Sequence, residues 1–151
     1  MADGETGPAV AFYVLPGASA EARLQFACRI TDKAYRSGQN VLIWHSDREE
    51  LARLDELLWV SGDDRSFIPH ELVAGRETCE APVLLTHATL PPERIDVLIN
   101  LAEAVPQCAS RAARIVEIVD ADQARRQAGR ERFRAYRELG VTPATHHIAS
   151  E

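Results

Sequence analysis

The chain contains few of the residues that mark several common classes of protein. Its 151 residues include three cysteines, Cys28, Cys79 and Cys108, which are widely spaced and form no C-x-x-C pair. An odd number of scattered thiols indicates neither a disulfide framework nor a zinc site. No apolar run approaches the roughly 18 residues of a membrane-spanning helix. The acidic segment Met1–Pro8 is unlike a secretory signal, so a cytoplasmic location is expected.

Positive charge is also scarce and comes almost entirely from arginine. There are 17 Lys and Arg residues against 23 Asp and Glu residues, a net charge of −6 at pH 7, and Lys33 is the only lysine. This balance disfavours general affinity for nucleic acid. The arginines are spread along the chain but cluster after Asp122, and this local cluster needs an explanation.

The glycine motifs that hold nucleotide phosphates are missing. The sequence contains neither G-x-x-x-x-G-K-[ST] nor G-x-G-x-x-G. His45 and His70 follow strands or lie in loops, where catalytic groups occur on α/β folds, but neither has a nucleophile or ligand partner at a diagnostic spacing. The adjacent His146 and His147 are expected to be solvated rather than metal-bound. No catalytic group, cofactor or metal site is predicted.

Short runs of β-branched and other apolar residues predict a sheet. Five strands are expected, at residues 10–15, 41–44, 83–85, 97–99 and 115–119. Most of these runs are continuously apolar, as in a parallel sheet that is covered on both faces. A helix is predicted at 20–36, with Ser19 as N-cap, and another at 47–59, which starts with the capping-box pattern Ser46-x-x-Glu49.

This order of elements predicts the fold class and the domain organisation. Strands and helices alternate with short connections, which implies right-handed βαβ units. The predicted class is α/β: a doubly wound, mainly parallel five-stranded sheet with helices on both faces. Residues 1–8 are expected to be a flexible extension, 9–142 one α/β domain that contains a long connection at 61–81, and 143–151 a loose tail.

A helix predicted at 125–139 carries the arginine cluster. At about 3.6 residues per turn, one arc of about 100° collects Arg126, Arg130, Phe133, Arg134 and Arg137. The other side, expected to pack on the core, collects Ala124, Ala128, Ala135 and Leu139. Guanidinium groups around an aromatic ring suit an acidic, partly apolar peptide or a phosphate-bearing strand. The alternative is a solvated helix face with Phe133 in the core.

Several segments, taken in order, carry a family resemblance. They are Phe12-Tyr13-Val14-Leu15, Arg36-Ser37-Gly38 before Val41-Leu42-Ile43, Arg53-Leu54-Asp55-Glu56 with Leu58-Trp59, Ser66-Phe67-Ile68-Pro69-His70-Glu71-Leu72, Ala81-Pro82, Asp96-Val97-Leu98-Ile99-Asn100-Leu101 and Arg130-Glu131-Arg132-Phe133-Arg134-Ala135-Tyr136-Arg137. In this order and spacing the chain resembles the chi subunit family of bacterial DNA polymerase III holoenzyme.

The resemblance implies a Rossmann-like fold without a nucleotide site and a non-catalytic subunit of a DNA-directed DNA polymerase assembly. Such an adaptor links the clamp-loader complex, through the psi subunit, to the acidic C-terminal tail of the single-stranded-DNA-binding protein. The tail-binding positions of the family match Arg126, Arg130, Phe133 and Arg134 here. Arg130 is expected to hold the terminal carboxylate of the tail, because a guanidinium can bind it bidentately.

A second surface and other classes of function are also considered. Trp59, Phe67 and Pro69 match family positions that bind psi or a competing DNA-repair helicase, although Trp59 could simply end a helix and Phe67 close the core. The alternative functions are a nucleotide-binding module or small-molecule enzyme that uses His45 or His70, and direct nucleic-acid binding by the arginine helix.

Overall fold

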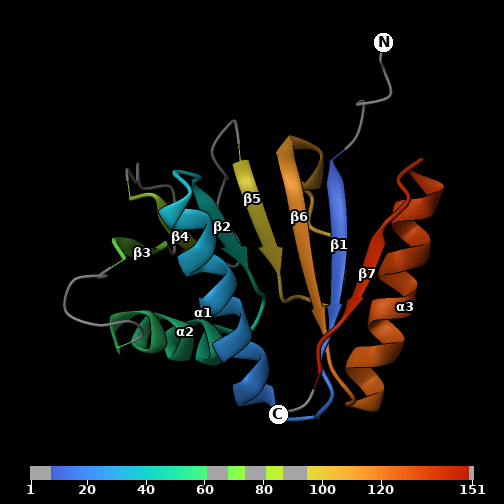
Figure 1. Ribbon diagram of the computed structural model, residues 1–151, viewed down its shortest axis with the longest axis horizontal. Coiled ribbons are helices and arrows are strands. Elements are labelled where there is room, and N and C mark those ends of the chain that lie inside the picture. Colours follow the sequence, from blue (N-terminus) through green and yellow to red (C-terminus); the bar gives the residue numbers. More distant parts are fainter. Residues whose placement is uncertain (1–7, 61–67, 74–80, 87–94, 150–151) are drawn as a thin grey trace.

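A parallel sheet forms the centre of the structure (Figure 1). The computed structural model describes residues 8–60, 68–73, 81–86 and 95–149. Within these residues the strands are β1 (Ala9–Val14), β2 (Val41–Trp44), β3 (His70–Val73), β4 (Val83–Thr86), β5 (Ile95–Asn100), β6 (Ala112–Val119) and β7 (Ala144–His147). They form a seven-stranded sheet in the order β3-β4-β2-β5-β6-β1-β7, and every described pair is parallel. The predicted α/β class is confirmed, but five strands are too few.

The two unpredicted strands, β3 and β7, form the edges of the sheet. β3 lies where a long connection is expected, and β7 lies within the stretch expected to be a loose tail. The sequence of β7 is Ala-Thr-His-His and all four residues are exposed, so it lacks the apolar run of an inner strand. Its pairing with β1, which places His146 beside Tyr13, makes it a strand.

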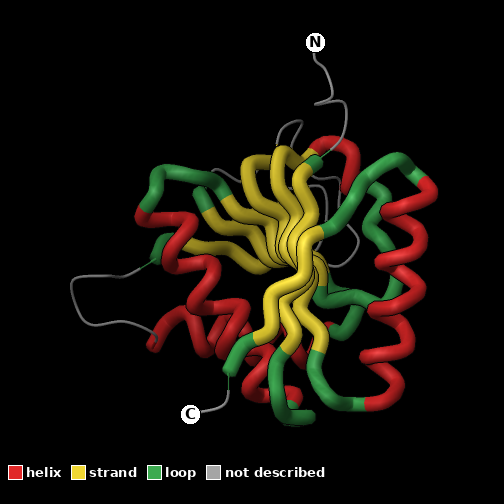
Figure 2. Tube along the Cα trace, turned by 45° about the vertical axis from the view of Figure 1, so that its right-hand side comes forward, coloured by secondary structure: helices red, strands yellow, loops and turns green. Residues whose placement is uncertain are grey.

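Helices cover both faces of the sheet, as predicted. Figure 2 shows α1 (Ala20–Arg36) and α2 (Arg48–Val60) on one side and α3 (Gln123–Glu138) on the other. A short 3₁₀ helix, η1 (Ala109–Arg111), precedes β6. The connections through α1 and α2 run toward the β3 edge, whereas the connection through α3 runs toward the β7 edge. Right-handed crossovers in opposite directions place their helices on opposite faces.

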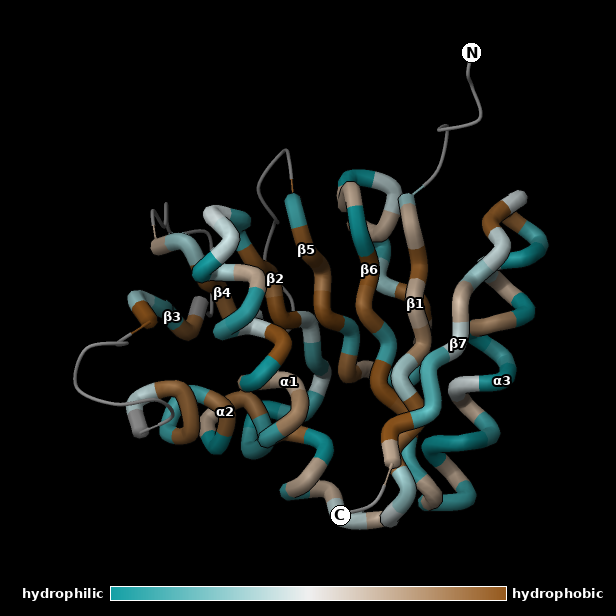
Figure 3. The backbone as a smooth tube through the Cα atoms, viewed as in Figure 1, coloured by the Kyte–Doolittle hydropathy of each residue, from teal (hydrophilic) through white to brown (hydrophobic). Residues whose placement is uncertain are grey.

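The core has two parts, one on each face of the sheet. On β2, Val41 and Ile43 belong to the cluster under α1 and α2, whereas Leu42 belongs to the cluster under α3. Alternate residues of a strand point to opposite faces, so a continuously apolar strand serves both clusters. Figure 3 shows the inner strands as hydrophobic and α3 as largely hydrophilic. The helix that carries the arginines thus buries little apolar surface.

The starts of the first two helices test the capping predictions. Ser19 is confirmed as the N-cap of α1, because its Oγ accepts a hydrogen bond of 3.1 Å from the N–H of Ala22. The capping box at Ser46 is wrong. The Oδ1 of Asp47 accepts hydrogen bonds from the N–H groups of Glu49 at 2.9 Å and Glu50 at 3.2 Å, and α2 starts one residue later, at Arg48.

The side of α3 that faces the sheet also differs from the prediction. Leu139, expected in the core, follows the helix and is 71% exposed. The buried residues of α3 are instead Gly129, Arg132 and Tyr136. Apolar periodicity failed here because two long polar side chains reach a carboxylate buried under the helix.

Candidate functional site

A buried polar network holds α3 on the sheet. Its centre is Glu117 of β6, which is 0% exposed. The Nε of Arg132 donates to Glu117 Oε1 at 2.7 Å, and the hydroxyl of Tyr136 donates to Oε2 at 2.7 Å. The Nδ2 of Asn100 donates to the same Oε2 at 2.9 Å. Because Arg132 and Tyr136 are both tied to one carboxylate, the rotation of α3 about its axis is fixed.

Burial controls protonation within this network. Desolvation raises the pKa of Glu117, and the positive charge of Arg132 acts in the opposite direction. Desolvation also raises the pKa of Tyr136, and the neighbouring Glu117 raises it further, so the phenol keeps its proton and donates. The network therefore positions the helix and leaves Arg126 and Arg130 exposed on the flank of α3 next to the sheet.

A groove runs between α3 and the β1–β7 end of the sheet. It encloses about 380 Å³ and is lined by Phe12, Val14, Val119, Arg126, Gly129, Arg130, Phe133, Thr145 and His147. Phe12, Val14 and Val119 supply apolar surface from β1 and β6. The side chains of Arg126 and Arg130 are exposed, whereas Phe133 is partly buried, with its ring centroid 5.2 Å from that of Phe12. The groove thus combines apolar walls with two cationic groups.

The structure brings together three of the four residues expected to bind the tail: Arg126, Arg130 and Phe133 line the groove. Arg134 is exposed on α3 but is not among the lining residues. The sequence offered two interpretations of Phe133, a residue of the binding surface or a residue of the core. Both hold in part, because its ring packs against the core cluster under α3 and also lines the groove.

Sequence reasoning missed the opposite wall of the groove, which β7 supplies with Thr145 and His147. It also missed Gly129, where an added Cβ would lie 2.8 Å from Cγ2 of Val119. Side chains essentially never approach so closely, so a glycine lets α3 approach β6 at this point. No periodicity reveals these three residues, because their role depends on which strands pair and how closely the helix packs.

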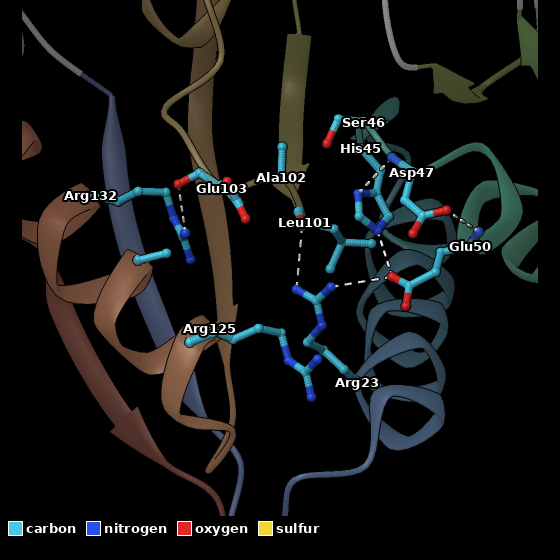
Figure 4. A pocket seen from close by; sticks show the side chains of 12 residues that line it. Arg23, His45, Ser46, Asp47, Glu50, Leu101, Ala102, Glu103, Arg125 and Arg132 are labelled. Atoms are coloured by element: carbon cyan, nitrogen blue, oxygen red, sulfur yellow. Dashed lines mark hydrogen bonds and ion pairs between the residues drawn. The ribbon is translucent and has the colours of Figure 1, made fainter.

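A second cleft lies at the carboxyl ends of β2 and β5, where open α/β sheets commonly bind ligands (Figure 4). It contains His45, whose Nε2 lies 2.6 Å from Oε1 of Glu50. Burial lowers the pKa of His45, which favours the neutral ring. Figure 4 shows the Arg23 guanidinium between Glu50 and the Leu101 carbonyl, with both contacts at 3.4 Å.

The three arginines of this second cleft, Arg23, Arg125 and Arg132, each pair with a carboxylate of the protein. Arg125 pairs with Asp120 at 2.7 Å, as Arg132 pairs with Glu117. Among the residues that the structure describes, His45 contacts the Glu50 carboxylate and the N–H of Asp47, and no hydroxyl or thiol that it could activate. The Nδ1 of His70 lies 2.7 Å from the Ile68 carbonyl, and its Nε2 lies 3.1 Å from Oδ1 of Asp55.

The residues of the expected second surface lie at the end of α2 and before β3. Trp59 is 60% exposed, and its ring packs edge-on against His70 with centroids 5.3 Å apart. Pro69 is partly buried, and Phe67 lies outside the described residues. Among the described residues no group of His, Cys, Asp and Glu could hold a metal ion, and no helix is long and apolar enough to cross a membrane.

Comparison with known proteins agrees with the resemblance. Residues 8–144 match the family described as DNA polymerase III chi subunit, HolC. The DNA polymerase III subunit chi of Pseudomonas aeruginosa is 41% identical over 139 residues, which cover 92% of this chain and 96% of the relative. The protein of the same name from Escherichia coli K12 is 34% identical over 117 residues, or 77% of this chain and 79% of the relative. That from Haemophilus influenzae is 28% identical over 138 residues, or 91% and 95% of the two chains. The chain therefore belongs to the DNA polymerase III chi subunit family.

Proposed function

We propose that this protein is a non-catalytic adaptor of the bacterial replication machinery in the cytoplasm. It binds the acidic C-terminal tail of the single-stranded-DNA-binding protein and links that protein to the clamp-loader complex through the psi subunit. The family supplies the functional context, and the groove between α3 and β7 supplies the observation that carries the proposal. Arg126, Arg130 and Phe133, expected to bind the tail, line this one groove with apolar residues of the sheet.

The chemistry of the groove matches such a tail. Arg130 holds the terminal carboxylate, because a guanidinium offers two parallel N–H donors to its two oxygens. Arg126, with Arg134 farther along α3, attracts the acidic residues that precede it. The apolar side chain at the end of the tail packs against Phe133, Phe12 and Val14. A micromolar complex needs about 8 kcal/mol, and one hydrogen bond to a charged group contributes about 1.5–3 kcal/mol, so apolar contact must supply part of the affinity.

The second surface binds the partner that connects the adaptor to the rest of the assembly. Trp59, Phe67 and Pro69 form it in this proposal, with psi or a DNA-repair helicase as the partner. The exposure of Trp59 supports this role, because a large aromatic side chain on the surface is a typical interface anchor. Trp59→Ala should therefore weaken capture of purified psi while leaving tail binding unchanged.

Fluorescence anisotropy with a labelled acidic peptide that ends in Pro-Phe tests the tail-binding function. The peptide with a free C-terminus should bind, and its amidated form should bind much more weakly because it lacks the terminal charge. Affinity should fall with added salt, since exposed charges are screened over about 8–10 Å at ordinary ionic strength. Equal binding of the two peptides, or binding of neither, would contradict the proposed function.

A further inference from the structure

The edge formed by β7 has main-chain groups available for another strand. In the described part of the chain, β7 is the last strand in sheet order and pairs with β1 alone. All four of its residues are exposed. The edge of a sheet presents a row of N–H and C=O groups, which is a ready template for an extended peptide.

The pairing with β1 shows which groups of β7 face outward. The N–H of Ile148 donates to the carbonyl of Val14 at 2.9 Å, and His146 is in register with Tyr13. In a parallel strand the N–H and C=O of one residue point to the same side, and successive residues alternate. His146 and Ile148 therefore face β1, so the N–H and C=O groups of Thr145 and His147 face the free edge.

The same alternation places the side chains of Thr145 and His147 in the groove. His146 lies on the other face of the sheet, where its ring stacks on Tyr13 with centroids 5.0 Å apart. Thr145 and His147 line the groove opposite Arg126 and Arg130. Outward main-chain donors and acceptors, exposed guanidinium groups and apolar walls thus occur together at one end of the sheet.

We infer that the acidic peptide binds as an eighth strand that pairs with the free edge of β7. This binding mode rests on the proposed function. Main-chain hydrogen bonds to Thr145 and His147 hold the peptide extended, while alternate side chains reach the groove. Arg126 and Arg130 then meet the carboxylates of the peptide. The partner is a peptide rather than a nucleic acid strand, because the edge offers complementary hydrogen bonds to a peptide backbone at every second residue.

Backbone N-methylation of the labelled peptide tests this pairing. Two peptides are made, one methylated at even and one at odd positions counted from the free C-terminus. Methylation at the positions that face β7 removes donors to the edge and should weaken binding about tenfold or more, whereas the other set should stay within about twofold of the parent. The unmethylated peptide could bind through its free carboxylate while both methylated peptides lose affinity to the same extent. This result would contradict the pairing with β7 but not the proposed adaptor function.

Amide hydrogen exchange followed by NMR supplies a readout on the protein side. The N–H groups of Thr145 and His147 should exchange more slowly when the parent peptide is bound. That of His146, which already faces β1, should change little. If the N–H groups of Thr145 and His147 exchange equally fast with and without a saturating concentration of peptide, the proposal is wrong. If the parent peptide does not bind at all, the proposed function fails together with the binding mode.

A pair of variants completes the test. Thr145→Pro removes one outward N–H, and proline is tolerated on the open side of an edge strand. The control, Thr145→Ala, removes the hydroxyl but keeps the N–H. Both variants lose the hydroxyl that lines the groove and only the proline also loses the N–H, so we expect Thr145→Pro to bind about three- to tenfold more weakly than Thr145→Ala. If both folded variants bind the peptide as tightly as the parent protein does, the peptide does not pair with the edge of β7. If Thr145→Pro disrupts β7, the N-methylated peptides determine whether this pairing occurs.

Discussion

Arg132 of α3 donates from Nε to Oε1 of Glu117 on β6 across 2.7 Å, and both side chains are buried. This contact fixes which side of α3 faces the sheet. A charge in the interior is tolerated only when it is paired and hydrogen-bonded, so α3 turns Arg132 and Tyr136 inward, together with Gly129. Arg126 and Arg130 are consequently left at the groove.

Glu117→Ala should strongly destabilise the protein, because it leaves Arg132 buried without its carboxylate. Breaking a buried pair by removing one partner typically costs about 3–5 kcal/mol of unfolding free energy. Urea denaturation measures the change. Arg53→Ala is the matched control, since its ion pair with Glu21, at 2.6 Å, lies on the surface and should matter little. If the two variants lose the same free energy of unfolding, burial does not determine how much the Glu117–Arg132 pair stabilises the protein.

Gly129→Ala should lower stability although alanine favours helices. The gain in helix propensity is about 1 kcal/mol, but the new Cβ would lie 2.8 Å from Cγ2 of Val119, and overpacking typically costs about 1–3 kcal/mol. The double variant Gly129→Ala/Val119→Ala removes the clash. Thermal denaturation of a double-mutant cycle should therefore show a favourable coupling between the two substitutions. Strict additivity would mean that α3 does not need its close approach to β6.

Arg130→Ala should weaken binding of the free-carboxylate peptide by tenfold or more, since a bidentate charged contact contributes at least about 1.5 kcal/mol. Arg137→Ala is the control, because Arg137 is also exposed on α3 but lies outside the groove. It removes the same charge and should change affinity less than about twofold. Anisotropy titrations at one salt concentration compare the two. Similar losses would indicate a general effect of charge rather than a carboxylate site at Arg130.

The buried His45 should make stability fall in mild acid. Its pKa is lowered in the folded protein, mainly by burial, so the folded state resists protonation. The unfolded chain takes up this proton near the ordinary histidine value of about 6.5. Unfolding is therefore favoured as the pH falls through about 6.5 toward the lowered folded value, and the stabilisation is fully present above it.

The measurement is the unfolding free energy at about pH 7.5 and about pH 5.5, on either side of the ordinary histidine pKa. His45→Gln, which cannot take up the proton, should lose less stability between the two conditions than the parent protein. His146→Gln is the control, because His146 is exposed on β7. An unchanged pH dependence in His45→Gln would place the acid sensitivity in other groups.

The local pattern of residues was sufficient for the inner part of the fold. α1 has the predicted bounds, Ala20–Arg36, and β2 the predicted Val41–Trp44. The bounds of both elements are determined by local sequence, because a cap, a helical period and a continuous apolar run each involve only neighbouring residues. The predicted cap of α2, Ser46, is wrong by one residue. Asp47 is the cap, because its side chain is the one that accepts from the free N–H groups at the start of the helix.

The sequence by itself determined the α/β class, the helices on both faces and the arginine-rich character of α3. Only the tertiary structure decided that Thr145 and His147 stand opposite Arg126 and Arg130, because β7 becomes a strand through pairing with β1, at the other end of the chain. It also decided the rotation of α3, since the buried carboxylate that orients Arg132 and Tyr136 comes from β6. Hydrophobic periodicity records which residues avoid water, but not which distant polar group a buried arginine will meet.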